Sequence, residues 1–171
     1  MFDKIRTLQK ALQREKLDRF KRRVGFGDLV TDRWDNAREY GFGEGTSVYD
    51  SVFVTGAVTV GRDNWIGPNV VLDGLGGLTI GDGCTICAGA QIYSHNTVRR
   101  GLTGGAAPME TQSTAIGSNV YIGPNSVVAM GVTIGDGVVV GALSFVDASI
   151  PPGKKAWGTP ARIVGDADPS I

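Results

Sequence analysis

The chain has 171 residues and carries 17 Lys and Arg against 17 Asp and Glu, so its formal net charge is zero. This length suits one domain with a real core, and the neutral balance gives no general attraction to nucleic acid. No apolar run approaches the roughly 20 residues of a membrane span, and the charged N-terminus lacks an apolar signal-peptide core, so we expect a cytoplasmic protein.

Residues 1–24 are predicted to form an amphipathic helix. Phe2, Ile5, Leu8, Leu12 and Phe20 recur at roughly helical spacing, and the segment holds nine Lys or Arg against three Asp or Glu. Such a helix suits capping of an open sheet end or packing between subunits, and a basic helix also suits peripheral contact with an anionic membrane. Residues 25–41 show no regular pattern and complete an N-terminal segment, 1–41.

From residue 42 to residue 150 the chain repeats a six-residue phrase. An aliphatic residue is usually followed by Gly, then by two turn-forming residues and a small residue. A short-period repeat is typical of a solenoid. Fifteen positions begin these hexads, and all are apolar: Phe42, Val48, Val54, Val60, Ile66, Leu72, Ile80, Ile86, Ile92, Ile116, Ile122, Val128, Ile134, Val140 and Val146.

Each hexad provides about four extended residues and a tight bend, because residues that accept positive φ recur at its fourth position. Three bends close a triangle, so the repeat predicts an all-β solenoid of about five coils. Counting in threes defines the faces: face one starts at Phe42, face two at Val48 and face three at Val54. The order survives both breaks in spacing, two extra residues near Leu78 and a long insertion at 98–115, so we expect both to bulge out at corners. The insertion is predicted to be one long extruded loop.

Cys84 and Cys87 form a C-x-x-C within the repeat rather than at the start of a helix. Cys84 falls at the small-residue position, which favours a buried side chain over a redox or metal role.

His95 is the one histidine, and it occupies a bend immediately before the long loop. Sites tend to be built on loops mounted on a rigid scaffold, and an imidazole can accept a proton from a hydroxyl or an amine near neutral pH. One turn earlier, Asp73 lies on the same face. It is predicted either to cap a turn or to accept a hydrogen bond from the hydroxyl of a bound sugar.

The hexads, the histidine followed by a loop, and the ending from Ile150 to Val164 together resemble the hexapeptide-repeat acyltransferases, in character the sugar and polysaccharide O-acetyltransferases. The resemblance covers residues 42–165. It implies a left-handed parallel β-helix, a homotrimer with active sites between subunits, and acetyl-CoA lying along the coils as acyl donor, with no metal.

Carried over by position, the resemblance makes His95 the catalytic base of a direct transfer to a sugar or polysaccharide-precursor hydroxyl. It places a cofactor-binding aromatic at Tyr121 and small cofactor-facing residues further along the coils. Cations of the C-terminal tail, 151–171, would meet the nucleotide phosphates. The predicted cofactor-binding residues are Tyr121, Gly123, Gly141, Ala142, Lys154, Lys155 and Arg162.

The predicted acceptor-binding residues are Asp73, Arg99 and Glu110, the last two in the loop beside the expected cleft. Two other functions stay open. An N-acetyltransferase of an amino-sugar nucleotide would use the same histidine, and a non-catalytic β-helix scaffold would use none. The zinc-dependent carbonic anhydrases of this fold need three histidines at each site, which one histidine per subunit cannot supply.

Overall fold

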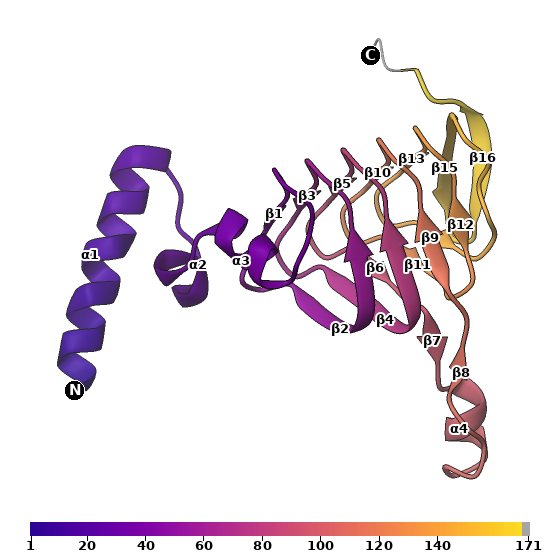
Figure 1. Ribbon diagram of the computed structural model, residues 1–171, viewed down its shortest axis with the longest axis horizontal. Coiled ribbons are helices and arrows are strands. Elements are labelled where there is room, and N and C mark those ends of the chain that lie inside the picture. Colours follow the sequence, from indigo (N-terminus) through magenta and orange to yellow (C-terminus); the bar gives the residue numbers. More distant parts are fainter. Residues whose placement is uncertain (169–171) are drawn as a thin grey trace.

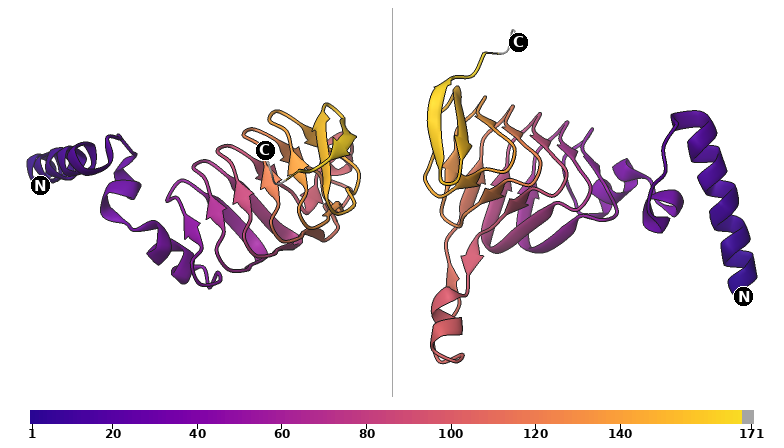
Figure 2. Two further views of the ribbon diagram at one scale, coloured as in Figure 1. Left: turned by 90° about the horizontal axis from the view of Figure 1, so that it is seen from above. Right: turned by 180° about the vertical axis from the view of Figure 1, so that it is seen from behind.

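The computed structural model describes residues 1–168, and it is elongated (Figure 1). Helices occupy one end, a β-solenoid forms the body, and a two-stranded hairpin closes the other end. One segment leaves the solenoid sideways near its C-terminal end, as the right-hand view of Figure 2 also shows.

The N-terminal segment contains three helices, α1 (Phe2–Phe20), α2 (Phe26–Val30) and α3 (Arg33–Glu39). The expected amphipathic helix is therefore present, and the part expected to be irregular holds two more. The start of α3 is capped by Asp32, whose carboxylate accepts hydrogen bonds from the backbone N–H groups of Trp34 (2.9 Å) and Asp35 (3.3 Å).

The predicted capping of the solenoid by the first helix is wrong. The helix that packs against β1 is α3, whose Ala37 is buried. Helix α1 has no buried residue and contacts α2 instead. Helix α3, which begins at its own N-cap residue Asp32, therefore covers the end of the solenoid that α1 was expected to cover.

The solenoid has three faces made of short parallel strands. Face two is one continuous sheet of β1 (Ser47–Val48), β3 (Trp65–Ile66), β5 (Thr85–Ile86), β10 (Tyr121–Ile122), β13 (Val139–Val140) and β15 (Lys154–Gly158), with β16 (Ala161–Asp166) antiparallel at its end. Faces one and three are joined because β2 (Phe53–Val60) and β4 (Val71–Ile80) run around their shared corner. Face three continues with β6 (Gln91–Ile92), β11 (Val127–Val128) and β14 (Phe145–Val146), and face one with β9 (Thr114–Ile116) and β12 (Thr133–Ile134).

The strand register confirms the assignment of hexads to faces. On face three, Leu72 pairs with Val54 on one side and with Ile92 on the other. Val128 then pairs with Ile92 and with Val146, so the hexad starts lie in one ladder. Their side chains fill the interior, because successive residues of a strand point to opposite sides. Cys84 lies in this core as expected, and burial raises the pKa of its thiol.

The bends also follow the sequence. Asp63, Asn69, Asn119 and Asn125 occupy the fourth hexad position, and their φ angles are 57°, 57°, 57° and 56°. Asn and Asp tolerate this left-handed conformation better than other side chains, which is why the chain can turn there at little cost.

The solenoid is a left-handed parallel β-helix of about six turns, so the prediction of five coils was one short. Turns 1 to 6 start at residues 42, 60, 80, 116, 134 and 150. Ile150 bridges to Ile134, and Ala156 of β15 pairs with Val140 of β13. The segment expected to be a tail from residue 151 thus adds a sixth layer and folds back as β16. The prolines at 151 and 152 hid this layer because they break the hexad pattern.

Candidate active site

The candidate site is built where the corner between faces three and one departs from the regular repeat. In turn 2 the register of β2 and β4 shifts between Gly56 and Val58, which places the two extra residues around Leu75–Gly77. In turn 3 the same corner releases the long loop. Both insertions bulge out at a corner as predicted, and they share one corner in adjacent turns.

The long loop begins and ends in a small antiparallel pair, β7 (His95–Asn96) and β8 (Glu110–Thr111), in which His95 lies opposite Thr111. The hydroxyl of Thr114 ties the two ends together. It donates to the Tyr93 carbonyl at 2.7 Å and accepts from the backbone N–H of Gly131 at 3.0 Å. The segment predicted as a loop over 98–115 also contains the helix α4 (Val98–Leu102), and its last residues already belong to β9.

Asp73 is the buried centre of this corner, with 1% of its side chain exposed. One carboxylate oxygen accepts a hydrogen bond from the backbone N–H of Leu75 at 3.0 Å. The other accepts from the backbone N–H groups of Ser94 (2.9 Å) and His95 (3.1 Å), and it also contacts Nδ1 of the His95 ring. The extra residues of turn 2 and the start of the loop thus converge on one carboxylate.

These contacts decide the charge of Asp73. Burial alone would raise the pKa of the carboxyl group. The hydrogen bonds from Ser94, Leu75 and His95 outweigh that effect and hold the pKa below its ordinary value of 3.8. Asp73 is therefore an anion at neutral pH.

The prediction that Asp73 contacts an acceptor hydroxyl needs correction. Its carboxylate is covered by the protein, and its oxygens already serve three backbone N–H groups and the imidazole. The residue that it serves is His95. The signal in the sequence was an aspartate just before a two-residue insertion, one turn before the histidine and at the same corner.

His95 is held on the other sides as well, while 23% of its side chain stays exposed. The Tyr93 ring meets the imidazole edge-on, with ring centroids 6.2 Å apart. The backbone beneath is fixed by Ser94, whose fully buried hydroxyl accepts from the Gly76 N–H at 2.8 Å. Neither Ser94 nor Gly76 was predicted as a site residue, since each matches an ordinary bend residue of the repeat.

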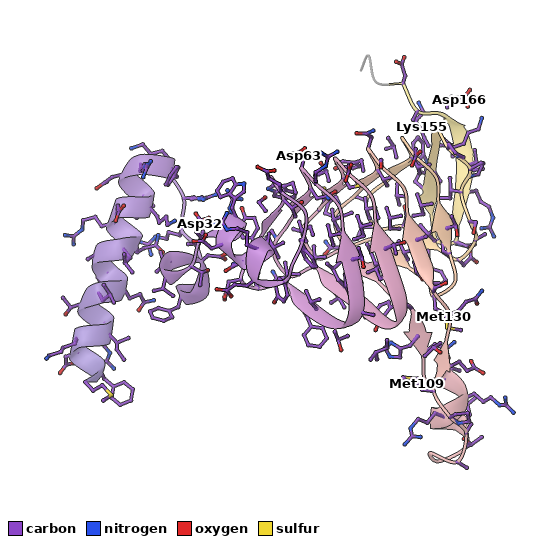
Figure 3. All side chains as sticks on the ribbon, in the orientation of Figure 1. Asp32, Asp63, Met109, Met130, Lys155 and Asp166 are labelled. Carbon is purple, nitrogen blue, oxygen red and sulfur yellow. The ribbon has the colours of Figure 1, made fainter. Side chains whose placement is uncertain are left out.

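The loop residues predicted to bind an acceptor lie at different distances from this corner. Glu110 is half-buried in β8, opposite Asn96 and one residue from the partner of His95. Arg99 is exposed on α4, which Figure 1 places at the outer end of the loop, away from the solenoid. Figure 3 marks Met130 at the foot of this loop, where its sulfur accepts a hydrogen bond from Asn96 at 3.4 Å. Within one chain, Glu110 is near His95 and Arg99 is not.

The predicted cofactor residues gather on face two and its following corner. Tyr121 of β10 points outward and half-exposed, and a hydrogen bond with Cys87, aided by burial, raises the pKa of its hydroxyl. Gly123 and Gly141 lie where the backbone of the next turn passes closely. A Cβ at Gly123 would come within 2.5 Å of the Ala142 nitrogen, and a Cβ at Gly141 within 2.8 Å of Trp157. The close stacking of turns is thus a structural reason for these glycines.

The predicted phosphate-binding cations lie at the C-terminal end, where Figure 3 labels Lys155 and Asp166. Lys154 forms an ion pair with Asp166, and Arg162 pairs with Asp147 at 3.3 Å. Lys155 is half-buried beside β16, opposite Gly165. Two of these three cations therefore form ion pairs within the chain, and Lys155 also interacts with Asp166, so a phosphate would have to compete with these carboxylates.

Two family models match the repeats. Residues 57–94 match the hexapeptide repeat of succinyl-transferase, and residues 113–148 match the bacterial transferase hexapeptide of six repeats. The chain belongs to the hexapeptide-repeat acyltransferase superfamily. Among curated members of this superfamily, galactoside O-acetyltransferase from Escherichia coli is 33% identical over 126 residues, which are 62% of each chain. A putative colanic acid biosynthesis acetyltransferase from Escherichia coli is 36% identical over 109 residues, 63% of this chain and 57% of that one.

Solved structures of the superfamily share the fold. A hexapeptide-repeat-containing acetyltransferase from Vibrio cholerae matches with a TM-score of 0.70 and 27% identity, over 96% of this chain and 93% of that one. AntD, an N-acyltransferase from Bacillus cereus solved with dTDP and 3-hydroxybutyryl-CoA, matches with a TM-score of 0.67 and 25% identity, over 76% and 73%. The chain spans 62% and 57% of the length of the two curated Escherichia coli relatives.

Residues 1–168 contain neither a candidate metal site nor a candidate membrane-spanning helix. In this range no group of three or more His, Cys, Asp or Glu side chains is placed to hold a metal ion. None of the helices in the same range is long and apolar enough to cross a membrane.

Proposed function

We propose that this protein transfers an acetyl group from acetyl-CoA to a hydroxyl of a sugar or surface-polysaccharide precursor, with His95 as general base. The observation that carries the proposal is the contact between His95 Nδ1 and the buried Asp73 carboxylate. Because the chain belongs to an acyltransferase superfamily, acyl transfer is the reaction in which this pair of residues would act.

The pair suits proton abstraction. A carboxylate can only accept hydrogen bonds, so Asp73 selects the tautomer with the proton on Nδ1 and leaves Nε2 free to accept one. The acceptor hydroxyl would lose its proton to Nε2 while its oxygen attacks the thioester carbon. The resulting oxyanion would be stabilised by backbone N–H groups, and the imidazolium would return the proton to the departing thiolate. The anionic Asp73 would stabilise the imidazolium in between.

The predicted cofactor residues support acetyl-CoA lying along the solenoid axis. His95 belongs to turn 3, Tyr121 to turn 4, Gly141 to turn 5 and Lys155 to turn 6, where Lys155 shares one ladder with Tyr121 through Val139. Adjacent strands lie about 4.8 Å apart, so these residues span roughly 14 Å along the axis. The thioester would lie at the level of His95, and the nucleotide near the cations of the C-terminal end.

The same residues support a homotrimer with its active sites between subunits. Gly123 and Gly141 lie at the corner after face two, whereas His95 lies at the corner after face three. The faces are about four extended residues wide, roughly 13 Å, so one subunit cannot present both groups to one thioester. A second copy that packs its His95 corner against the other corner would complete the site.

The relatives support the choice of acceptor. The galactoside O-acetyltransferase and the putative colanic acid acetyltransferase, at 33% and 36% identity, favour a sugar hydroxyl. The structural likeness to AntD supports the alternative, an amino-sugar nucleotide acetylated on nitrogen, because the histidine can serve either nucleophile. Glu110 is the acceptor-binding candidate nearest the base in its own subunit, and Arg99 would act across the subunit boundary.

The test is release of free thiol from acetyl-CoA with a panel of sugars, amino-sugar nucleotides and polysaccharide fragments. Wild type is compared with His95→Ala and with Arg62→Ala, which changes an exposed residue at the corner after face one. We expect turnover with one acceptor that falls roughly 10²–10⁴-fold in His95→Ala alone. Turnover that survives in this variant would remove the base assignment. Wild-type protein that binds no acetyl-CoA would replace the enzyme with a scaffold.

A further inference from the structure

Helix α1 contacts α2 within the subunit but takes no part in the hydrophobic core of the solenoid. It has no buried residue, and both views in Figure 2 show it beyond the end of the solenoid, connected through α2 and α3. The solenoid end that it was expected to cover already has α3 packed against β1. Its surface is therefore available for another partner.

The first half of α1 exposes an apolar stripe. Phe2, Ile5 and Leu8 are 77%, 44% and 51% exposed, and their spacing of three residues keeps them on one side of the helix. At 100° per residue, Lys4 and Arg6 flank Ile5 on either side of this stripe. An apolar strip bordered by long cationic side chains suits the boundary between headgroups and acyl chains, where the charged ends reach up to water.

The charge of the chain is divided between its two parts. Residues 1–24 hold nine of the 17 Lys and Arg but three of the 17 Asp and Glu, a formal charge of +6, so the remainder carries −6. Within the helix Arg6 has a loose, exposed ion pair with Asp3 at 3.8 Å. Lys16, Arg19 and Arg22 surround the ring of Phe20. An anionic surface would attract the helix and repel the solenoid.

We propose that α1 is a peripheral anchor that lies on an anionic lipid bilayer, with Phe2, Ile5 and Leu8 at headgroup depth. Anchoring by α1 would not depend on acyl transfer, because it does not use His95. In Figure 1 the helix runs across the solenoid axis, so an α1 lying flat on a bilayer lets the solenoid project from the surface.

A second α1 helix, from another copy of the chain, is a poorer occupant of this surface. Two α1 helices that pair through their apolar stripes would bring the flanking cations of both copies together, and like charges in contact oppose association. A bilayer containing anionic lipids supplies the opposite charge, worth about 1 kcal/mol for each Lys or Arg near its surface. Three apolar residues bind weakly by themselves, so the attachment should be reversible and sensitive to salt.

The test is flotation of the full chain with two kinds of vesicle, one of pure phosphatidylcholine and one in which about a third of the lipid is anionic phosphatidylglycerol, whose negative surface attracts basic segments. We expect binding to the anionic vesicles alone, and its loss in molar salt. The double variant Lys4→Gln with Arg6→Gln should bind roughly ten- to thirtyfold more weakly. The double variant Phe2→Ser with Leu8→Ser should also lose binding. The matched control, Arg38→Gln with Arg62→Gln, removes two exposed cations outside α1 and should bind like wild type.

Three results would overturn the proposal. Equal binding to both kinds of vesicle, or undiminished binding of the α1 variants, would mean that α1 does not recognise anionic lipid. The third result would come from sedimentation in the absence of vesicles. If wild type self-associates and the α1 variants do not, the apolar stripe is an interface between copies of the chain. Circular dichroism of each variant checks that the solenoid is folded before its binding is compared.

Discussion

The Asp73 carboxylate and Nδ1 of His95 are in contact across adjacent turns of the solenoid, from β4 to β7. The same oxygen accepts the backbone N–H groups of Ser94 and His95, so one buried anion fixes both the main chain and the ring of the histidine. Such an arrangement sets the ring orientation and the tautomer together. Asp73 is thus a positioning residue for the proposed base.

The replacement Asp73→Asn should lower kcat by one to three orders of magnitude while KM for acetyl-CoA changes little. An amide can donate to Nδ1 and so favours the tautomer with its proton on the wrong nitrogen. Activity against pH should also change shape, because the imidazolium loses its anionic neighbour. Initial rates of thiol release, measured over a range of acetyl-CoA concentrations from pH 5 to pH 9, give kcat, KM and the pH profile. An unchanged profile with reduced stability would leave Asp73 a purely structural role.

The same carboxylate should contribute to stability in a pH-dependent way. Its pKa in the folded protein is below 3.8, so its contribution is present above that pH and is lost as the pH falls through the lower, folded value. At pH 7 we expect Asp73→Asn to unfold about 1–3 kcal/mol more easily than wild type, since charge-assisted hydrogen bonds are weakened. Urea midpoints should converge as the pH falls below 3.8. A constant difference between pH 7 and pH 3 would contradict the linkage.

Gly76 should matter because it supports the histidine from beneath. A Cβ at this position would lie 2.3 Å from the Ser94 carbonyl oxygen, so Gly76→Ala must displace the backbone that leads into His95. We expect at least a tenfold loss of kcat together with about 1–3 kcal/mol of stability, the range for overpacking. Gly101→Ala is the control, because a Cβ there meets no atom within 4 Å. The measurements are kcat and the melting temperature of both variants. If Gly76→Ala matched Gly101→Ala in both, the supporting role of Gly76 would be refuted.

Tyr121 should affect the acyl donor more than the chemistry. Its half-exposed ring lies on face two of turn 4, one turn beyond the turn that holds His95. The proposed acyl donor would pass along this face. We expect Tyr121→Ala to raise KM for acetyl-CoA roughly tenfold, the loss of about 1.4 kcal/mol of contact, with kcat within a factor of three. Titration calorimetry with CoA provides an independent measurement. Phe145→Ala, a comparably exposed aromatic on face three, should leave KM unchanged.

Much of the fold could be predicted because the repeat is local. The period of six sets the apolar position, the bend and the face of each hexad, and the register of Leu72 with Val54 and Ile92 follows by counting. The sixth turn was missed because Pro151 and Pro152 interrupt that pattern where Ile150 and Ala156 continue the ladders. The helices α2 and α3 were missed because five and seven residues are too few to show a period.

The sequence by itself determined the solenoid, the single histidine and its place before a loop, since these depend on residues close together in the chain. Only the tertiary structure decided what Asp73 does, because its burial and its contact with His95 arise when turn 3 stacks on turn 2. The place of α1 likewise followed from packing: α3 took the end of the solenoid, and the basic helix was left exposed. Stacking brings residues 22 positions apart into contact, and hexad spacing alone does not say which of their side chains will meet.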